Sequence, residues 1–202
     1  MRLDDLDLDR EYTYADYYQW KFSKQVELIE GKVHKMSHSS NKLHQQISKN
    51  LFNCFRDSRQ NSSGKILIAP FEMRLPSLAK NDKEIHTVLQ PDIAVTGDHA
   101  IIFNGGCLGE PDIVVEILRY GDGIKELKYK YKVYEAAGVK EYWIVMPAYH
   151  FVQVFTLVNN KFEASPIKTT EDEITTPILP GLALKVDMIF KEEDFDDGYI
   201  RI

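Results

Sequence analysis

The sequence lacks the features that mark several common classes of protein. No apolar run approaches the ~18 residues that a membrane-spanning helix needs, so we expect no membrane partner. The acidic stretch 1–12 lacks the basic-then-apolar pattern of a secretory signal. The two cysteines, Cys54 and Cys107, lie in different segments without CxxC spacing. This pattern predicts reduced thiols in a cytoplasmic protein.

Motifs of three familiar enzyme classes are also missing. The glycine-rich segment 103–111 has neither a GxGxxG nor a P-loop pattern, so we expect a loop there with no nucleotide role. The serines at 39–40 have no GxSxG context, which disfavours a serine hydrolase. The histidines between 34 and 44 do not have the helical spacing of a zinc site.

The chain has no surplus of positive charge, which a nucleic-acid-binding surface usually needs. Its net charge is −6, but residues 1–11 and 191–202 each contribute −3. The remaining body is neutral, with 21 acids and 21 bases. A neutral body permits a local basic groove without requiring one. The length of 202 residues suits a single domain, 1–202, with acidic terminal segments and a core at about 13–190.

Periodicity and turn residues predict the elements of this domain. A short helix is expected after Thr13, followed by a β-hairpin at 26–36 and a helix at 39–58. A further helix is expected at 123–137. Strands are expected at 65–76, 89–97, 112–118, 141–147 and 151–158.

The order of these elements predicts the fold class. The strand, helix, strand order from 112 to 146 predicts a right-handed parallel crossover. The earlier strands have shorter connections, which suit antiparallel pairing. We therefore expect an α/β (α+β) fold, in which helices flank a mixed central β-sheet and an N-terminal helix and β-hairpin are added.

Two acids stand where apolar residues are expected. Asp92 lies within LQPDIAV (89–95), and Glu116 lies in the middle of DIVVEIL (112–118). Strand side chains alternate between faces, so the two carboxylates converge if their strands are neighbours. Paired carboxylates repel unless a cation lies between them, and hard oxygen ligands suit Mg²⁺ or Mn²⁺. The alternative is that each acid faces water at a strand end, which fits Glu116 less well because both its neighbours are apolar.

A helical wheel singles out one lysine of the 123–137 helix. With Leu127 at zero, Lys130 falls at about 300°, between Ala137 at about 280° and Tyr134 at about 340°. Lys130 therefore points the same way as the apolar side chains. The alternative is that its stem lies on apolar surface while its ammonium group reaches water. The two upstream carboxylates favour a lysine that reaches them.

Two further polar residues remain open to interpretation. His44 lies on the apolar side of its own helix, where a histidine is more often a hydrogen-bonded core residue than a ligand. Glu27 begins a predicted strand and can point either way.

The ordered set of motifs resembles the PD-(D/E)xK phosphodiesterases, the superfamily of restriction endonucleases and related nucleases. It is most similar to the Uma-type restriction endonuclease family, also catalogued as a domain of unknown function. The resemblance extends over most of the chain and is carried by VELIEGKV, the His44 helix, APFEMRL, QPDIAV, EPDIVVEIL, YKVYEAAGVKEYWIV and PILPGLAL.

The resemblance implies a restriction-endonuclease-like core and a role for each candidate. Asp92 and Glu116 would be the metal-binding carboxylates, and Ile117 would offer a backbone carbonyl to the metal. In this family the lysine lies in the following helix, at the position of Lys130, while Leu118 occupies the usual superfamily position. Glu27 and His44 match supporting positions of the family.

The chain departs from the family pattern at two places. Residues 119–122 read Arg-Tyr-Gly-Asp where the family has a serine-proline stretch. The family usually has an acid at the position before Pro147, whereas this chain has Met146.

These observations predict a Mg²⁺- or Mn²⁺-dependent endonuclease that hydrolyses phosphodiester bonds of DNA. By analogy with other enzymes of this fold, we expect the protein to form a homodimer. One alternative is a catalytically inactive nuclease-fold module that binds nucleic acid or a protein partner. Another is a hydrolase of small phosphodiesters.

Overall fold

The computed structural model describes residues 3, 6–22, 25–36, 41–59, 64–75, 81–97, 100–103, 105–118 and 124–192. The helices are α1 (Tyr14–Tyr17), α2 (Lys42–Ser58), α3 (Ile124–Ala137), α4 (Val186–Phe190) and the 3-10 helix η2 (Pro147–Tyr149). The strands are β1 (Val26–Ile29), β2 (Lys32–Lys35), β3 (Lys65–Ile68), β4 (Glu72–Leu75), β5 (Thr87–Leu89), β6 (Ile93–Thr96), β7 (Ile101–Phe103), β8 (Gly106–Leu108), β9 (Ile113–Ile117), β10 (Glu141–Met146), β11 (Phe151–Val158), β12 (Lys161–Ala164), β13 (Glu173–Thr176) and β14 (Leu179–Lys185).

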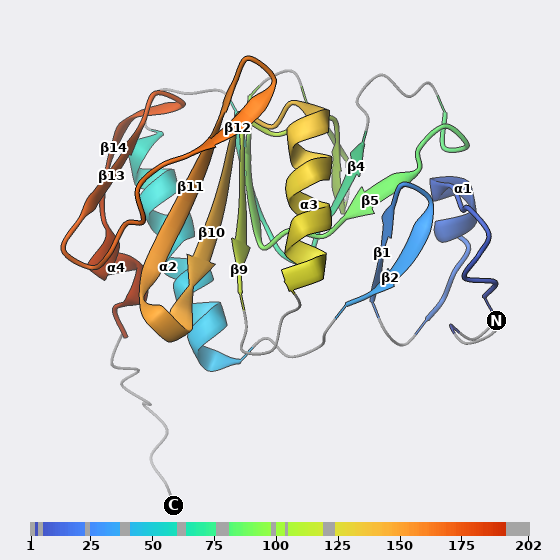
Figure 1. The fold of residues 1–202 in the computed structure, drawn as a ribbon, viewed down its shortest axis with the longest axis horizontal. Coiled ribbons are helices and arrows are strands. Elements are labelled where there is room, and N and C mark those ends of the chain that lie inside the picture. The colour runs from blue at the N-terminus through green and yellow to red at the C-terminus, as the bar shows by residue number, and fades with distance from the viewer. Residues whose placement is uncertain are drawn as a thin grey trace, which may run out of the picture.

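The central sheet is mixed and carries helices on both faces (Figure 1). Its strand order is β12-β11-β10-β9-β6-β3. Strands β9 and β10 are parallel and are joined through α3, as the sequence predicts, whereas the other neighbours are antiparallel. Every residue of β9 is buried, because α3 covers one face of the sheet and α2 the other. A continuous apolar strand such as β9 is typical of a sheet covered on both sides.

A second large sheet lies at the α1 end of the molecule, in the order β2-β1-β5-β4-β8-β7. It includes the predicted hairpin, whose turn residues Glu30 and Gly31 have φ of 51° and 79°. Positive φ at both central positions suits the tight turn of a two-residue hairpin. Thr13 is the N-cap of α1, as predicted, and it forms a capping box with Asp16. The fold class is therefore confirmed, with two large mixed sheets in place of one.

Two of the predicted segments differ in the structure. The strand expected at 65–76 breaks at Ala69 and Pro70 into β3 and β4, which belong to different sheets. Proline has no N–H to donate to a sheet, so a continuous central strand cannot pass through it. The expected loop at 103–111 contains β8, which pairs with β7 and β4. A Cβ atom at Gly106 would lie 2.0 Å from the Glu72 carbonyl oxygen, so this close pairing requires glycine.

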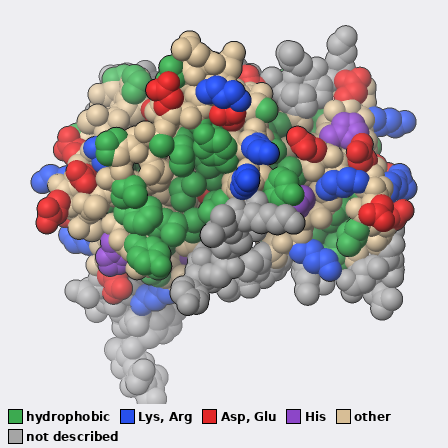
Figure 2. Space-filling view, viewed as in Figure 1, with side chains coloured by type: hydrophobic (Ala, Val, Ile, Leu, Met, Phe, Trp, Pro, Cys, Tyr) green, Lys and Arg blue, Asp and Glu red, His purple; other side chains and the backbone are tan. Residues whose placement is uncertain are grey.

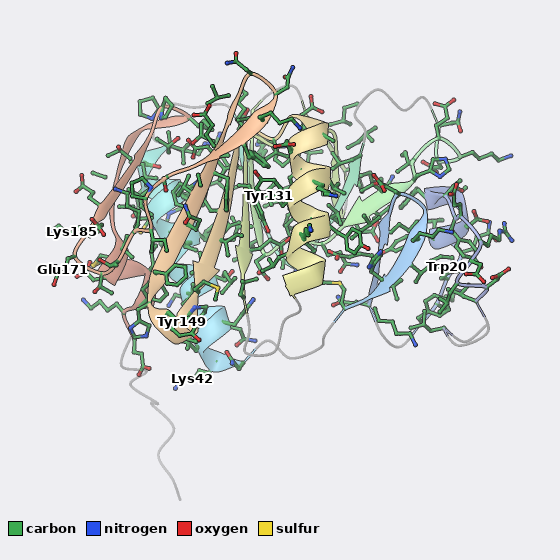
Figure 3. All side chains as sticks on the ribbon, viewed as in Figure 1. Trp20, Lys42, Tyr131, Tyr149, Glu171 and Lys185 are labelled. Atoms are coloured by element: carbon green, nitrogen blue, oxygen red, sulfur yellow. The ribbon has the colours of Figure 1, made fainter. Side chains whose placement is uncertain are left out.

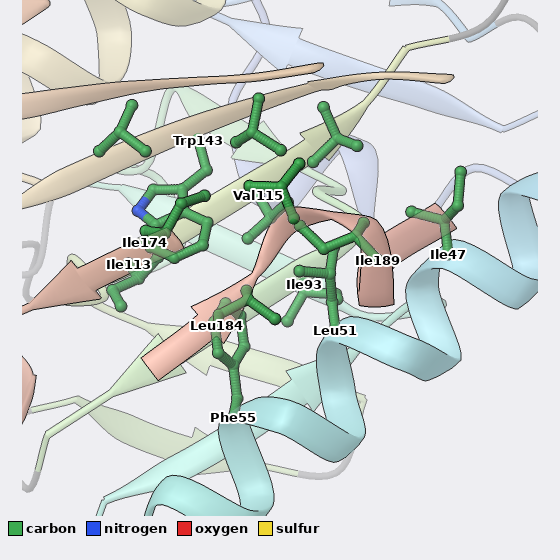
Figure 4. Close-up of a cluster of buried hydrophobic side chains, with 14 of the residues drawn as sticks. Ile47, Leu51, Phe55, Ile93, Ile113, Val115, Trp143, Ile174, Leu184 and Ile189 are labelled. Atoms are coloured by element: carbon green, nitrogen blue, oxygen red, sulfur yellow. The ribbon is translucent and has the colours of Figure 1, made fainter. Parts of the chain in front are cut away.

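The two faces of the central sheet pack into separate apolar cores. Ile113, Val115 and Ile117 of β9 point toward α2, β14 and α4, where they join the cluster shown in Figure 4. Val114 points the other way and packs with Tyr134 of α3 and with residues of the second sheet. Because side chains alternate along a strand, Glu116 lies on the same face as Val114. It therefore faces α3.

The surface of the described residues carries no simple charge pattern on the face seen in Figure 2. Acidic and basic side chains are interspersed, and apolar side chains gather over the strands beside α3. Among the helices in the described part of the chain, none is long and apolar enough to cross a membrane.

Candidate functional site

Lys130 lies between two buried carboxylates. Its Nζ is 3.0 Å from Oε1 of Glu116 and 3.1 Å from Oε1 of Glu27. Lys130 is only 4% exposed, so its ammonium group does not reach out to bulk water, and the orientation predicted by the helical wheel is confirmed. Glu27 is 0% exposed and Glu116 is 8% exposed. Removing one partner from such a buried cluster leaves an uncompensated charge, so these three side chains depend on one another.

Helix α3 supplies a second partner for Glu116 that was not predicted from the sequence. Tyr134 donates a 2.7 Å hydrogen bond from its hydroxyl to Glu116 Oε1. It lies four residues after Lys130, so both side chains project from one face of the helix. The i, i+4 spacing was the signal that could have found Tyr134, whose ring alone suggested an ordinary core residue.

Asp92 lies directly across from Glu116. The antiparallel register pairs Ile93 with Val115, and its continuation by one residue places Asp92 opposite Glu116. Opposed residues of an antiparallel pair have Cβ atoms roughly 4.5–5.5 Å apart and share a face. The two acids that the sequence marked as misplaced therefore converge at the end of β6 and β9.

The carboxylate of Asp92 is held from both sides. Its Oδ2 accepts a 2.7 Å hydrogen bond from the backbone N–H of Ile117, and its Oδ1 lies 3.1 Å from Nε2 of His44 on α2. The His44 contact is close without being a well-aligned hydrogen bond. His44, Asp92 and Ile117 thus form one group around the strand end.

Glu27 connects this cluster to the residue before the PD motif. Its Oε1 accepts a 2.7 Å hydrogen bond from the backbone N–H of Gln90, while its Oε2 is buried and has no hydrogen-bond partner among the described residues. Gln90 also donates from its side chain to Tyr17 and to the Val26 carbonyl. A buried carboxylate oxygen without a donor is unusual in a folded protein. Glu27 therefore links Lys130 to the backbone just before the PD motif.

Burial sets the protonation of Glu116. Desolvation is the main cause that raises its pKa to about 8; Lys130 and the Tyr134 hydrogen bond lower it, whereas the charges of Asp92 and Glu27 raise it. Glu27 and Glu116 thus share one lysine, and the charge of Asp92 acts on Glu116 as well. A group of this composition gains stability by holding either a proton or a metal cation.

The residues present fit a magnesium-like ion, which is usually bound through one or two protein carboxylates, water and substrate phosphate. Asp92, Glu116 and the Ile117 carbonyl supply hard oxygens at one strand end. No group of three or more His, Cys, Asp or Glu side chains in the described ranges is arranged to hold a metal alone. A set of two carboxylates and one carbonyl would therefore leave several positions to water and phosphate.

The departures from the family pattern fall in different places. Arg119 and Tyr120, with the rest of 119–122, lie outside the described residues. Leu118 directly follows β9 and is half-buried. Met146 ends β10, just before the 3-10 helix η2. No lysine occupies the usual superfamily position, and Lys130 reaches Glu116 from α3 instead.

Comparisons with known proteins agree with this architecture. A crystal structure described as a putative nuclease belonging to DUF820 from Anabaena variabilis aligns with a TM-score of 0.69. The alignment covers 89% of this chain and 97% of that chain at 16% sequence identity, so the likeness is one of fold. A search of curated proteins found no match. The family model Uma2, described as "Putative restriction endonuclease", matches residues 14–187. The chain therefore belongs to the Uma2 family.

Proposed function

We propose that this protein is a divalent-metal-dependent endonuclease that hydrolyses phosphodiester bonds of DNA. The observation that carries the proposal is the buried cluster in which Lys130 lies within 3.1 Å of Glu27 and Glu116. The register that sets Asp92 opposite Glu116 supports it further. Two convergent acids and a lysine at the ends of two neighbouring strands suit phosphoryl transfer, where positioning and charge stabilisation provide most of the catalysis.

Each residue has a distinct role in this proposal. Asp92, Glu116 and the Ile117 carbonyl would hold Mg²⁺ or Mn²⁺. The ion, when bound, polarises the phosphate and lowers the pKa of an attacking water. Lys130 would position that water or stabilise the charge that develops on the phosphate oxygens. Glu27 would keep Lys130 in place when the Glu116 carboxylate turns toward the metal.

His44 and Tyr134 would act as positioning residues. His44 lies against Asp92 Oδ1, and the Ile117 N–H holds Oδ2, so the Asp92 carboxylate has little freedom to rotate. Tyr134 holds Oε1 of Glu116 from α3. Outer partners of this kind fix the orientation of metal-binding groups.

The wider setting belongs to the same proposal. We infer that residues 1–202 act as one restriction-endonuclease-like domain in the cytoplasm, where the free thiols of Cys54 and Cys107 stay reduced. A homodimer, expected by analogy of fold, stays a prediction that sedimentation can test.

Metal titration distinguishes the proposed enzyme from the alternative, a catalytically inactive module that only binds nucleic acid or a protein partner. We expect Mn²⁺ to raise the thermal unfolding midpoint of the wild-type protein, because an ion that binds only the folded state stabilises it. Asp92→Asn should abolish that rise. Asp112→Asn is the matched control, since Asp112 is a buried acid at the other end of the same face of the sheet and pairs with Lys140. DNA binding by the wild type without any effect of metal on its unfolding midpoint would favour the catalytically inactive module instead.

A further inference from the structure

A cavity of about 510 Å³ lies beside the candidate site and is lined largely by aromatic rings. We call it the aromatic cavity; its lining includes Tyr17, Tyr18, Trp20, Phe22, Arg74 and Gln90. Its volume lies within the roughly 300–1,000 Å³ of small-ligand sites. Nothing in the proposed phosphodiester chemistry uses these rings, so the aromatic cavity needs its own explanation.

The rings form a connected series at the α1 end of the molecule, where Figure 3 labels Trp20. Tyr17 lies 5.7 Å from Trp20 between ring centroids, and Trp20 lies 5.3 Å from Phe22. Tyr18 is 75% exposed, whereas Trp20 is half-buried. Partly exposed aromatic faces bind flat partners by stacking, and every nucleobase offers such a face.

Polar groups at one wall suit the edge of a base. The Arg74 guanidinium lies over the rings of Tyr14 and Phe103, with its Cζ 3.6 Å and 3.9 Å from their centroids. Its Nε is buried and has no hydrogen-bond partner in the described part of the chain. Glu72 Oε2 lies 3.8 Å from Arg74 Nη2, so an acceptor and a donor occur together. Arginine, glutamate and glutamine are side chains that hydrogen-bond to base edges.

Gln90 joins the aromatic cavity to the candidate site. Its side chain lines the cavity and donates to Tyr17, while its backbone N–H donates to Glu27, the partner of Lys130. Asp92 follows two residues later in the chain. A base held in the aromatic cavity would therefore have its sugar-phosphate backbone beside the acids.

We propose that the aromatic cavity binds an unstacked base of the nucleic-acid substrate, so that the enzyme acts on single-stranded DNA or on a flipped-out nucleotide. The inference rests on the proposed nuclease function and names its substrate class. A base inside a duplex has both faces stacked and cannot enter such a cavity. The body of the chain has no net positive charge, so base stacking supplies affinity that phosphate contacts alone would not.

Fluorescence of Trp20 tests this directly, because the other tryptophan, Trp143, is fully buried in the apolar core that the central sheet forms with α2. The probe is a short single-stranded oligodeoxynucleotide in the presence of a chelator, so that neither metal nor cleavage is involved. We expect saturable quenching that is absent with the fully abasic strand and absent in Trp20→Phe. Equal quenching by the abasic strand, or equally tight binding of free mononucleotide, would overturn the proposal.

A pair of tyrosine variants provides the matched comparison. Tyr18→Ala should weaken oligonucleotide binding about fivefold or more, as expected for loss of one base–aromatic contact. Tyr149→Ala, at an equally exposed tyrosine (70%) far from the aromatic cavity in Figure 3, should leave binding unchanged. Equal effects of the two variants would contradict the inference.

Failure of the inference and failure of the proposed function give different results. Glu116→Gln should retain base-dependent quenching. If wild-type protein cleaves DNA with metal but shows no such quenching, only the inference fails. If it shows quenching and never cleaves, the proposed function fails and the cavity is a binding site alone.

Discussion

Two glutamates on neighbouring strands of the central sheet are equally hidden from water but differ in their partners. Glu141 of β10 is 3% exposed, and its two oxygens accept hydrogen bonds from Trp143 Nε1 at 2.8 Å and from Thr176 Oγ1 at 2.7 Å. Glu116 of β9 receives Lys130 and Tyr134 on a single oxygen, with further acids nearby. Burial raises the pKa of both carboxyls.

The difference shows that burial alone does not identify a functional acid. Glu141 has one neutral donor for each oxygen, so its site is complete and needs no other ligand. Glu116 shares one lysine with Glu27 and has Asp92 opposite, so its site is crowded with negative charge. The crowding, together with a Glu27 oxygen that has no hydrogen-bond partner among the described residues, supports the proposed cation site.

Substitution of Lys130 should lower the free energy of unfolding more than any other change at the Glu116 cluster. Lys130→Met leaves two buried carboxylates without their cation, which costs about 3–5 kcal/mol when one partner of a buried ion pair is lost. We expect a large fall in the free energy of unfolding and loss of cleavage. Arg56→Met is the control: Arg56 pairs with Asp57, and both side chains are exposed (58% and 66%), so the loss should stay below about 1 kcal/mol. Urea unfolding of both variants measures the contrast, and equal losses would contradict it.

The protonation of Glu116 should make the metal-free protein less stable as pH rises. Its pKa is about 8 in the folded chain and 4.5 as the ordinary value, so between these the folded state binds an extra proton. That contribution is fully present below pH 4.5 and is lost as pH rises through about 8. The slope is about 1 kcal/mol per pH unit. Chelator-treated wild type should show this slope, and Glu116→Gln should lack it; an unchanged slope in the variant would assign it to other groups.

Tyr134→Phe should have the smallest effect. It removes one neutral hydrogen bond to Glu116, worth about 1 kcal/mol, and leaves the Lys130 contact intact. We expect slightly lower stability and a higher Glu116 pKa, seen as a shift of the pH–stability curve to higher pH. A loss of stability equal to that of Lys130→Met would contradict this ranking, because the hydroxyl would then contribute as much as the lysine.

The sequence predicted the parts of the site that depend on a single element. Alternation along a strand placed Glu116 on the Val114 face, and the helical wheel turned Lys130 toward the core. It missed Glu141 because an acid at the start of a strand looks solvent-exposed, while its partner Thr176 lies 35 residues away. Such partners depend on tertiary contacts.

The same reason explains the errors in the fold. Pro70 marked a break within residues 65–76, which were nevertheless predicted as one strand, but the assignment of the two halves to different sheets depends on tertiary contacts. Gln90 was missed because its role depends on Glu27, which lies 63 residues earlier.

DNA cleavage by two matched variants tests the central claim most directly. Glu116→Gln and Glu141→Gln make the same chemical change at buried positions in adjacent strands, and both would be assayed with Mg²⁺ after their folding is verified by circular dichroism. We predict no cleavage by Glu116→Gln and cleavage near the wild-type rate by folded Glu141→Gln. Cleavage by Glu116→Gln at the wild-type rate would contradict it.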